Sequence, residues 1–565
     1  MDKKFKRDRA VLIFLILIAL SATSFMIVRY FLPSNEEQTL FQHDPTLDDG
    51  EYHIIVEDEL INVENRPMKE DSELYLPVDF IKDYGIDEYI HWDKQASQLI
   101  ITTENKVMRM STRSLNYTVN NKEMQLAVPI YQSDKIAYMP KSLIEELYNV
   151  SISYSEKNKL AIVDYKDREK VLGTVTKKSN VRYEPDLKSY IGEKLEEGDK
   201  LYVLNQVDDK FTKVRTMDGM FGYIETAKII NTEIIPATFK EPEPTKQKTL
   251  PNGKINLVWD LITVQQANAN ESKRKPHKGV TVLSPTWFEF DLEKQNGDLL
   301  DIADISYVDW AHRNGYQIWA LLSDNYDPSV GANILPNAEY RQHIINQILD
   351  FISMYNLDGI NLDFERIQPE NVEYFLQFLR ELSPMLKDTD TILSIDLYVP
   401  LYTRYYNRTE IEKSIDYACV MTYDEHTGTD PGPVASYDFV DKGITDTLEE
   451  IPREKILMGI PFYSRVFRNG KRSGEYGRDA TIKMFQERGA SFEWLEDKKV
   501  YYATYTVTED GAETKYEVWL ENERSLTEKM QIFKKYDLVG VASWSRALHH
   551  DIYFDIIDEN LNSPH

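Results

Sequence analysis

Short apolar runs alternate with amphipathic segments through the C-terminal half of the chain, and this alternation predicts its fold. Runs of strand length stand at 255–259, 279–283, 317–322, 359–365, 392–398, 417–423, 455–460 and 538–544. Between them apolar residues recur at helical spacing, as in Ile344, Ile345, Ile348, Leu349 and Ile352, and again in Val372, Phe375, Leu376 and Leu379. Eight strand–helix units over about 310 residues predict a (β/α)₈ TIM barrel, with a doubly wound open sheet as the alternative.

One interval between strands is unusually long. The segment KKVYYATYTVTEDGAETKYEVWLEN, residues 498–522, lies between the seventh and eighth predicted strands. Its β-branched and aromatic residues indicate a small β-rich insertion. Active sites of these barrels lie at the carboxyl ends of the strands, so we expect the insertion beside the cleft.

The first 33 residues predict an attachment to the membrane. Lys3, Lys4, Lys6, Arg7 and Arg9 precede an apolar run from residue 10 to about residue 28. That run is close to the roughly 20 residues that cross a bilayer, which predicts a single-pass signal anchor in the cell membrane, with the later domains outside. Cleavage at the small residues 21–24 is the alternative, and it would release the protein to the cell wall.

Changes of composition between the anchor and the barrel predict further domains. The predicted boundaries are 1–33 for the basic segment and anchor, 34–50 for a spacer, 51–168 for an α+β stalk, 169–232 for a small all-β barrel, 233–252 for a proline-rich charged linker and 253–565 for the TIM barrel. The chain is therefore predicted to be multidomain.

The predicted stalk contains a weak internal repeat. Each copy opens a short helix on a proline, at 77–84 and at 140–148, and ends in a strand, at 97–103 and at 160–165. The domain that follows is punctuated by glycines at 173, 192, 198, 219 and 222, which is typical of short strands joined by turns.

Charge and composition exclude several classes of function. The formal net charge of −28 argues against nucleic-acid binding, which depends on basic patches. A single cysteine, Cys419, excludes an internal disulfide framework. His426, His549 and His550 have no partner at metal-ligand spacing, so they are interpreted as surface or loop residues, and neither a metal nor a cofactor is predicted. No feature of the sequence predicts an oligomeric state.

The fourth predicted strand carries the strongest chemical signal, the octapeptide DGINLDFE at 358–365. Asn361, Asp363 and Glu365 alternate with apolar residues, so their side chains share one face of the strand. Acids two residues apart on such a face lie roughly 6–7 Å apart at Cα. Their repulsion favours a proton on one of them, and a protonated acid beside an ionised one suits the cleavage of a glycosidic bond.

Five segments in order make the barrel resemble glycoside hydrolase family 18, the chitinase-like family. They are DGINLDFE, VMTYDEH at 420–426, GPVAS at 432–436, ILMGIPFYSR at 456–465 and VGVASW at 539–544, and the resemblance covers about residues 252–550. The segment VWLENERSLTEKM looks most similar to the branch that acts on bacterial walls and spore peptidoglycan.

The resemblance implies a role for each site residue. Glu365 would be the general acid and base, Asp363 would hold the 2-acetamido N–H of the substrate, and Tyr423 would donate to the acetamido oxygen, which is the nucleophile in this substrate-assisted retaining scheme. Trp544 would floor the subsite, and Asp424 and Met421 would line it, with core packing as the alternative role of Met421.

Two departures from the family pattern affect these expectations. Asn361 stands where the family has an aspartate. An asparagine cannot share a proton with Asp363, so an altered pH profile of activity is expected. Asn361 is predicted to be one of the substrate-binding residues. The segment LLSDNYD at 321–327 replaces the Ser-x-Gly-Gly of chitinases, which weakens a chitinase assignment.

The predicted function is therefore an extracytoplasmic glycosidase that cleaves β-1,4 bonds after N-acetylglucosamine in peptidoglycan. A chitinase acting on chitin-like glycans, a non-catalytic carbohydrate-binding protein and a surface scaffold are the alternatives. The stalk resembles the copper amine oxidase N-terminal domain, although no ligand set suggests copper. Residues 169–232 resemble a bacterial SH3-like domain, which implies wall binding.

Overall fold

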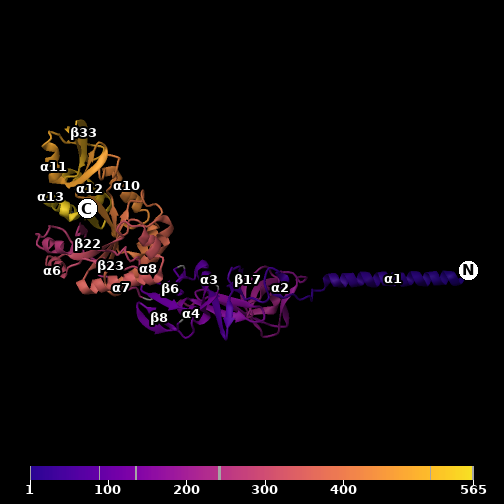
Figure 1. Ribbon diagram of the computed structural model, residues 1–565. Coiled ribbons are helices and arrows are strands. Elements are labelled where there is room, and N and C mark those ends of the chain that lie inside the picture. Colours follow the sequence, from indigo (N-terminus) through magenta and orange to yellow (C-terminus); the bar gives the residue numbers. More distant parts are fainter. Residues whose placement is uncertain are drawn as a thin grey trace. The chain divides into compact units, whose positions relative to one another are not determined.

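The computed structural model describes residues 2–87, 89–112, 114–133, 136–239, 244–509 and 511–562. The chain folds into two compact units. The first comprises residues 1–90, 112–115 and 126–242, and the second comprises residues 91–111, 116–125 and 243–565. Figure 1 shows the elements of both along the chain.

Eight parallel strands close into a barrel in the second unit, which confirms the predicted barrel and excludes the open sheet. Neighbouring strands pair in parallel around the ring, and the first pairs with both the second and the last. The strands are β21 (Ile255–Asp260), β22 (Val282–Phe290), β24 (Gln317–Ser323), β25 (Gly359–Asp363), β26 (Ile392–Tyr398), β27 (Tyr417–Met421), β28 (Ile456–Pro461) and β34 (Gly540–Trp544).

Helices follow the strands and cover the barrel (Figure 1). They are α6 (Ile305–Arg313), α7 (Ala338–Tyr355), α8 (Val372–Asp388), α9 (Arg408–Ser414), α10 (Tyr437–Thr447), α12 (Glu523–Tyr536) and α13 (Asp551–Leu561). Phe364, directly after β25, packs outward against a covering helix: it is 2% exposed and contacts the rings of Phe375 and Phe378 on α8. Burial of such rings on the outer face holds strand and helix together.

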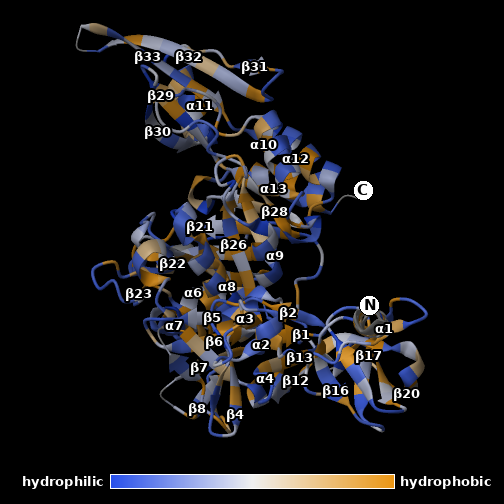
Figure 2. Cartoon of the chain, turned by 90° about the vertical axis from the view of Figure 1, so that its right-hand side faces the viewer, coloured by the Kyte–Doolittle hydropathy of each residue, from blue (hydrophilic) through white to orange (hydrophobic). Residues whose placement is uncertain are grey.

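The predicted insertion is larger than the sequence indicated. Figure 2 shows it as a separate layer of strands with one helix. It consists of β29 (Tyr463–Arg468), β30 (Lys471–Gly477), α11 (Arg478–Gln486), β31 (Glu493–Leu495), β32 (Val500–Glu509) and β33 (Ala512–Leu520). It leaves the barrel directly after β28, at the carboxyl end of that strand, and its sheet has its own small core around Val466, Phe485 and Val518.

A five-stranded meander from the predicted stalk belongs to the same compact unit as the barrel. Its strands are β5 (His91–Asp93), β6 (Gln98–Thr102), β7 (Val107–Ser111), β8 (Asn116–Val119) and β9 (Lys122–Gln125). Arg109 of β7 and Arg341 of α7 both bind the buried carboxylate of Glu381 on α8, at 2.6 and 2.9 Å. These two cations hold the pKa of Glu381 down to about 2, although burial alone would raise it.

The C-terminal part of the predicted linker is tied to the barrel. The Lys248 side chain is 4% exposed and pairs with Asp416 at 2.6 Å, and Thr249 donates to both carboxylate oxygens of Asp390. This stretch is fixed by specific contacts despite its linker-like composition.

Two four-stranded sheets and two short helices that open on proline lie in the first unit. The strands of these two sheets are β1 (His53–Val56), β2 (Glu59–Ile61), β3 (Met68–Glu70), β4 (Glu73–Pro77), β10 (Tyr131–Ser133), β11 (Ile136–Pro140), β12 (Val150–Ser155) and β13 (Leu160–Tyr165). Pro77 caps α3 (Val78–Asp83) and Pro140 caps α4 (Lys141–Leu147), as the repeat predicted.

Seven antiparallel strands form one sheet at residues 170–235. They are β14 (Lys170–Val175), β15 (Ser179–Arg182), β16 (Ile191–Leu195), β17 (Lys200–Gln206), β18 (Phe211–Thr216), β19 (Phe221–Glu225) and β20 (Ile229–Ile235). This sheet agrees with the all-β structure predicted for residues 169–232. The resemblance of this region to an SH3-like domain stays a prediction.

The apolar N-terminal segment forms one helix, α1 (Asp2–Phe31), followed by the single turn α2 (Leu40–His43). Side chains of the basic residues 3, 4, 6 and 7 lie outside the described residues. Among the parts of the chain that the structure describes, no helix is both long and apolar enough to cross a membrane.

Candidate active site

Asp363 and Glu365 stand at the carboxyl end of β25, where the barrel opens. Both side chains are half-buried. Oδ1 of Asp363 is shielded from solvent and accepts no hydrogen bond from any described residue. An unpaired buried acceptor is destabilising by about 1–3 kcal/mol, so this oxygen is suited to receive a donor from a ligand.

Asn361 lies deeper in the barrel. It is 0% exposed, so it supports the site from beneath, and the predicted contact with substrate is corrected. Its Oδ1 accepts from Trp259 Nε1 at 2.8 Å and from Ser284 Oγ at 3.1 Å, and its Nδ2 donates to Asp396 Oδ1 at 2.8 Å. The direct acidic partner of Asn361 is therefore Asp396 on β26.

Asp363 and Asp396 hold their protons more tightly than an ordinary aspartic acid does. Burial raises the pKa of Asp363 well above its ordinary value, and the charges of Glu365 and Asp396 add to this effect. Burial also raises the pKa of Asp396, to about 8, against the hydrogen bond from Asn361. A site that keeps a carboxylic acid protonated near neutrality can perform general acid catalysis.

Glu365 is tuned by two tyrosines that the sequence did not single out. Burial raises its pKa, while hydrogen bonding to the hydroxyls of Tyr398 and Tyr326 acts in the opposite direction and the charges of Asp324 and Asp424 raise it further. Tyr398 ends β26, where Ser394, Asp396 and Tyr398 alternate with apolar residues. That alternation was a usable signal.

Tyr423 follows β27 and is 6% exposed. Burial raises the pKa of its hydroxyl well above the ordinary value, and Tyr463, Asp396, Asp424 and Glu365 add to the shift. The hydroxyl therefore stays protonated and is able to donate a hydrogen bond.

Asp424 is held by the insertion. Its backbone has a positive φ of 62°, and its Oδ1 accepts from the Tyr463 hydroxyl and, at 2.6 Å, from Arg465 Nη2. Arg465 is 2% exposed and also binds Glu475 of β30. The insertion thus contributes residues to the wall of the site, as its predicted place beside the cleft implies.

Trp544 and Met421 differ in exposure. Trp544 ends β34, is half-buried, and lies 6.1 Å from the Trp259 ring with the two planes at 57°. A half-exposed indole at this end of the barrel fits a sugar-facing floor. Met421 is 6% exposed and packs in the barrel core, so its place in the pocket stays a prediction.

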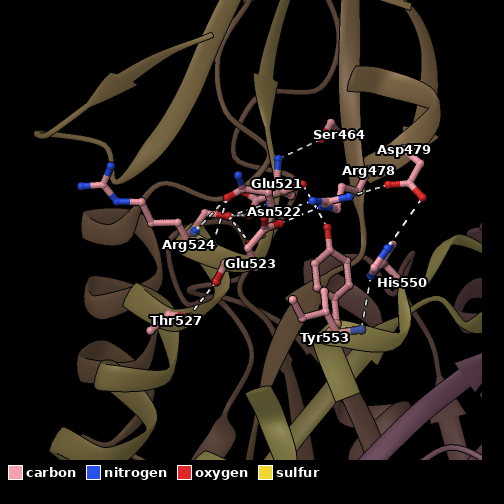
Figure 3. A network of polar contacts seen from close by, with 12 residues as sticks. Ser464, Arg478, Asp479, Glu521, Asn522, Glu523, Arg524, Thr527, His550 and Tyr553 are labelled. Carbon is pink, nitrogen blue, oxygen red and sulfur yellow. Dashed lines mark hydrogen bonds and ion pairs between the residues drawn. The ribbon is translucent and has the colours of Figure 1, made fainter. Parts of the chain in front are cut away.

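A polar network fixes the point where the chain returns from the insertion to the barrel (Figure 3). Glu521 follows β33; its backbone N–H donates to Ser464 Oγ at 2.8 Å, and its carboxylate pairs with the buried Lys529 of α12 at 2.8 Å. Arg478 of α11 binds Glu523, and the Tyr553 hydroxyl of α13 donates to the Glu521 carbonyl. These bonds join insertion, α12 and α13.

Two family models match the chain. Residues 315–548 match the glycosyl hydrolases family 18 model, and residues 55–163 match the copper amine oxidase N-terminal domain model. Both matches coincide with segments that the sequence motifs had indicated.

Two of the curated relatives come from Bacillus subtilis. YdhD of Bacillus subtilis, named provisionally as a sporulation-specific glycosylase, is 27% identical over 237 residues, 40% of this chain and 56% of YdhD. The cortical fragment-lytic enzyme of Bacillus subtilis is 23% identical over 255 residues, 43% of this chain and 58% of that enzyme. The chain thus spans little more than half the length of these two relatives.

A solved structure shares the fold. The Bacillus cereus spore cortex-lytic enzyme SleL matches with a TM-score of 0.50 and 18% identity, over 56% of this chain and 76% of SleL. The chain therefore carries a family 18 glycoside hydrolase domain together with a copper amine oxidase N-terminal domain.

Proposed function

We propose that the protein hydrolyses the β-1,4 bond on the reducing side of N-acetylglucosamine in peptidoglycan. Glu365 protonates the leaving glycosidic oxygen, and it later takes a proton from the water that completes hydrolysis. Its raised pKa supports the first role, because the acid must carry a proton at working pH.

The unpaired, buried Oδ1 of Asp363 is the observation that carries this proposal. In the proposed reaction the substrate's acetamido oxygen attacks C1 as the C1–O bond breaks, which gives a cyclic oxazolinium ion. Asp363 Oδ1 accepts the acetamido N–H, while the Tyr423 hydroxyl donates to the acetamido oxygen. Water then opens the ring at C1, so the anomeric configuration is retained.

Two features favour a bacterial wall polymer as the substrate. The relatives named above carry names that refer to sporulation or to the spore cortex. The all-β region before the barrel resembles wall-binding domains. Chitin-like glycans are the second candidate because they present the same acetamido group. Glu365 argues against a purely carbohydrate-binding role.

The dependence on the acetamido group is testable with matched substrates. The protein is incubated with peptidoglycan, with N-acetylglucosamine oligomers and with the same oligomers after deacetylation. Cleavage of acetylated glycans with no cleavage of deacetylated ones is expected. Rapid cleavage of a glucosamine-only oligomer would refute the proposed nucleophile, and faster turnover of the oligomers than of peptidoglycan would favour chitin.

We also propose that the N-terminal segment anchors the protein, with the barrel outside the cell. The basic cluster before the apolar run supports this orientation. Cell fractionation with protease added to intact protoplasts tests it: the barrel should be digested, and its full protection would contradict the outward orientation.

A further inference from the structure

Three side chains with metal-binding atoms converge from separate parts of the barrel unit, outside the residues proposed for hydrolysis. His277 lies in the segment before β22, His549 lies between β34 and α13, and Asp551 begins α13. Each offers one ligand atom, and these atoms all lie within 4.8 Å of one another. The sequence assigned His549 to a loop because its partner His277 is remote along the chain.

The spacing is close to that of a zinc site. His549 Nε2 and Asp551 Oδ1 lie 3.5 Å apart. With metal–ligand bonds of about 2.0–2.1 Å in tetrahedral geometry, two ligand atoms of one zinc ion lie roughly 3.3–3.5 Å apart. That pair therefore already has the required separation, and the ligand atom of His277 lies within 4.8 Å of both.

The imidazole of His549 is oriented as metal ligands usually are, and packing holds the ring of His277 beside it. Nδ1 of His549 hydrogen-bonds the carbonyl oxygen of Arg546, which leaves Nε2 as the free lone pair. The ring of His277 packs 4.5 Å from the His549 ring and 4.4 Å from the Phe554 ring, and its backbone is bonded to the Tyr316 hydroxyl. These contacts hold both rings in place before any ion binds.

The charges around the cluster are partly balanced. Arg546 Nε lies 3.5 Å from His277 Nε2, and the same guanidinium is paired with the buried carboxylate of Asp260. Asp551 adds a negative charge at the open side, where its side chain is 88% exposed.

We propose that His277, His549 and Asp551 bind one Zn²⁺ ion, with water as the fourth ligand. Two imidazoles and one carboxylate suit zinc, whereas Mg²⁺ and Ca²⁺ prefer oxygen ligands throughout. The ion links the segment that follows Trp544 to the segment that enters β22. Its role is structural, and it is independent of the proposed hydrolysis.

Zinc binding to the metal-stripped full-length protein is measured by competition with a chelating dye and by calorimetry. One tight site is expected, and His277→Ala and His549→Ala should each weaken it at least tenfold. His550→Ala and His343→Ala are matched controls, because these histidines lie outside the cluster; both should keep the site. Added zinc should raise the melting temperature of the wild type and of the controls, but not of His277→Ala.

Equal zinc affinity in the wild type, His277→Ala and His549→Ala would overturn the proposal, because the ion would then sit on other surface histidines. If either alanine variant fails to fold by circular dichroism, Asp551→Asn decides: this exposed change should still weaken zinc at least tenfold. Cobalt substitution gives an independent signature. An intense visible band of tetrahedral Co²⁺ is expected, and a weak octahedral spectrum would contradict the site.

Discussion

Replacing Asn361 by Asp removes the amide group that donates a hydrogen bond to Asp396. The wild-type Nδ2 donates to Asp396 Oδ1 at 2.8 Å, and the variant would place a second carboxylate oxygen there. Two unit charges at that distance repel by about 6 kcal/mol at an effective dielectric constant of 20, which corresponds to about four pKa units. The burial that raises the pKa of Asp396 to about 8 acts on a carboxyl at position 361 as well, so the variant should keep one proton more than the wild type at neutral pH.

The sign of the effect on stability follows from this proton. A carboxyl group with a raised folded-state pKa stabilises the fold fully below its unfolded pKa of about 4, and it loses that contribution as pH rises through the folded value. With one more proton bound in the folded state, Asn361→Asp should lose up to about 1.4 kcal/mol of unfolding free energy per pH unit relative to the wild type. Between pH 5 and pH 8 the loss amounts to at most about 4 kcal/mol.

Urea unfolding followed by tryptophan fluorescence at pH 5 and pH 8 measures this difference. Asn337→Asp is the matched control, because Asn337 caps α7 and aspartate caps helices equally well. The control should behave like the wild type at both pH values. A variant Asn361→Asp that is equally destabilised at pH 5 and pH 8, or more destabilised at pH 5, would refute the reasoning.

Four further substitutions give distinct outcomes. Glu365→Gln should lower kcat by about 10²–10⁴-fold while sugar binding persists in calorimetry; retained turnover would exclude Glu365 as the acid. Tyr398→Phe removes a hydrogen bond that lowers the pKa of Glu365, so the alkaline limb of the plot of kcat against pH should move to higher pH. An alkaline limb at the wild-type pH would show that this hydrogen bond does not tune Glu365. Trp544→Ala should raise KM more than it lowers kcat in steady-state assays, whereas an unchanged KM would exclude the sugar floor. Arg109→Met should lower the free energy of unfolding in urea by about 3 kcal/mol at pH 7. The effect should shrink as pH falls from 4.5 to 2, because Glu381 becomes protonated and its ion pair with Arg109 is lost. An equal effect at pH 7 and at low pH would argue that this ion pair does not stabilise the fold.

The barrel was predictable because its strands are buried on both faces. Continuous apolar runs placed β26 at 392–398 and the start of β27 at 417 to the residue. The second strand was placed three residues early, since β22 begins at Val282 and extends to Phe290. An apolar run shows that a strand is buried, but only pairing with neighbours defines where its ladder begins.

The site was predictable where one strand carries it and less so where several meet. Asp363 and Glu365 could be read from alternation along β25. Asp396 required the register that sets β26 beside β25, and the contact of Arg465 with Asp424 required the path of the insertion. The pairing of His277 with His549 depends on the closure of the barrel, which no local pattern encodes.

The proposed cleavage is tested most directly by the new reducing ends in digested peptidoglycan. After digestion with the full-length protein and reduction with borohydride, mass spectrometry identifies the reduced sugar at each new end. The proposed mechanism predicts reduced N-acetylglucosamine, with none formed by Glu365→Gln. Reduced N-acetylmuramic acid at the new ends would contradict it.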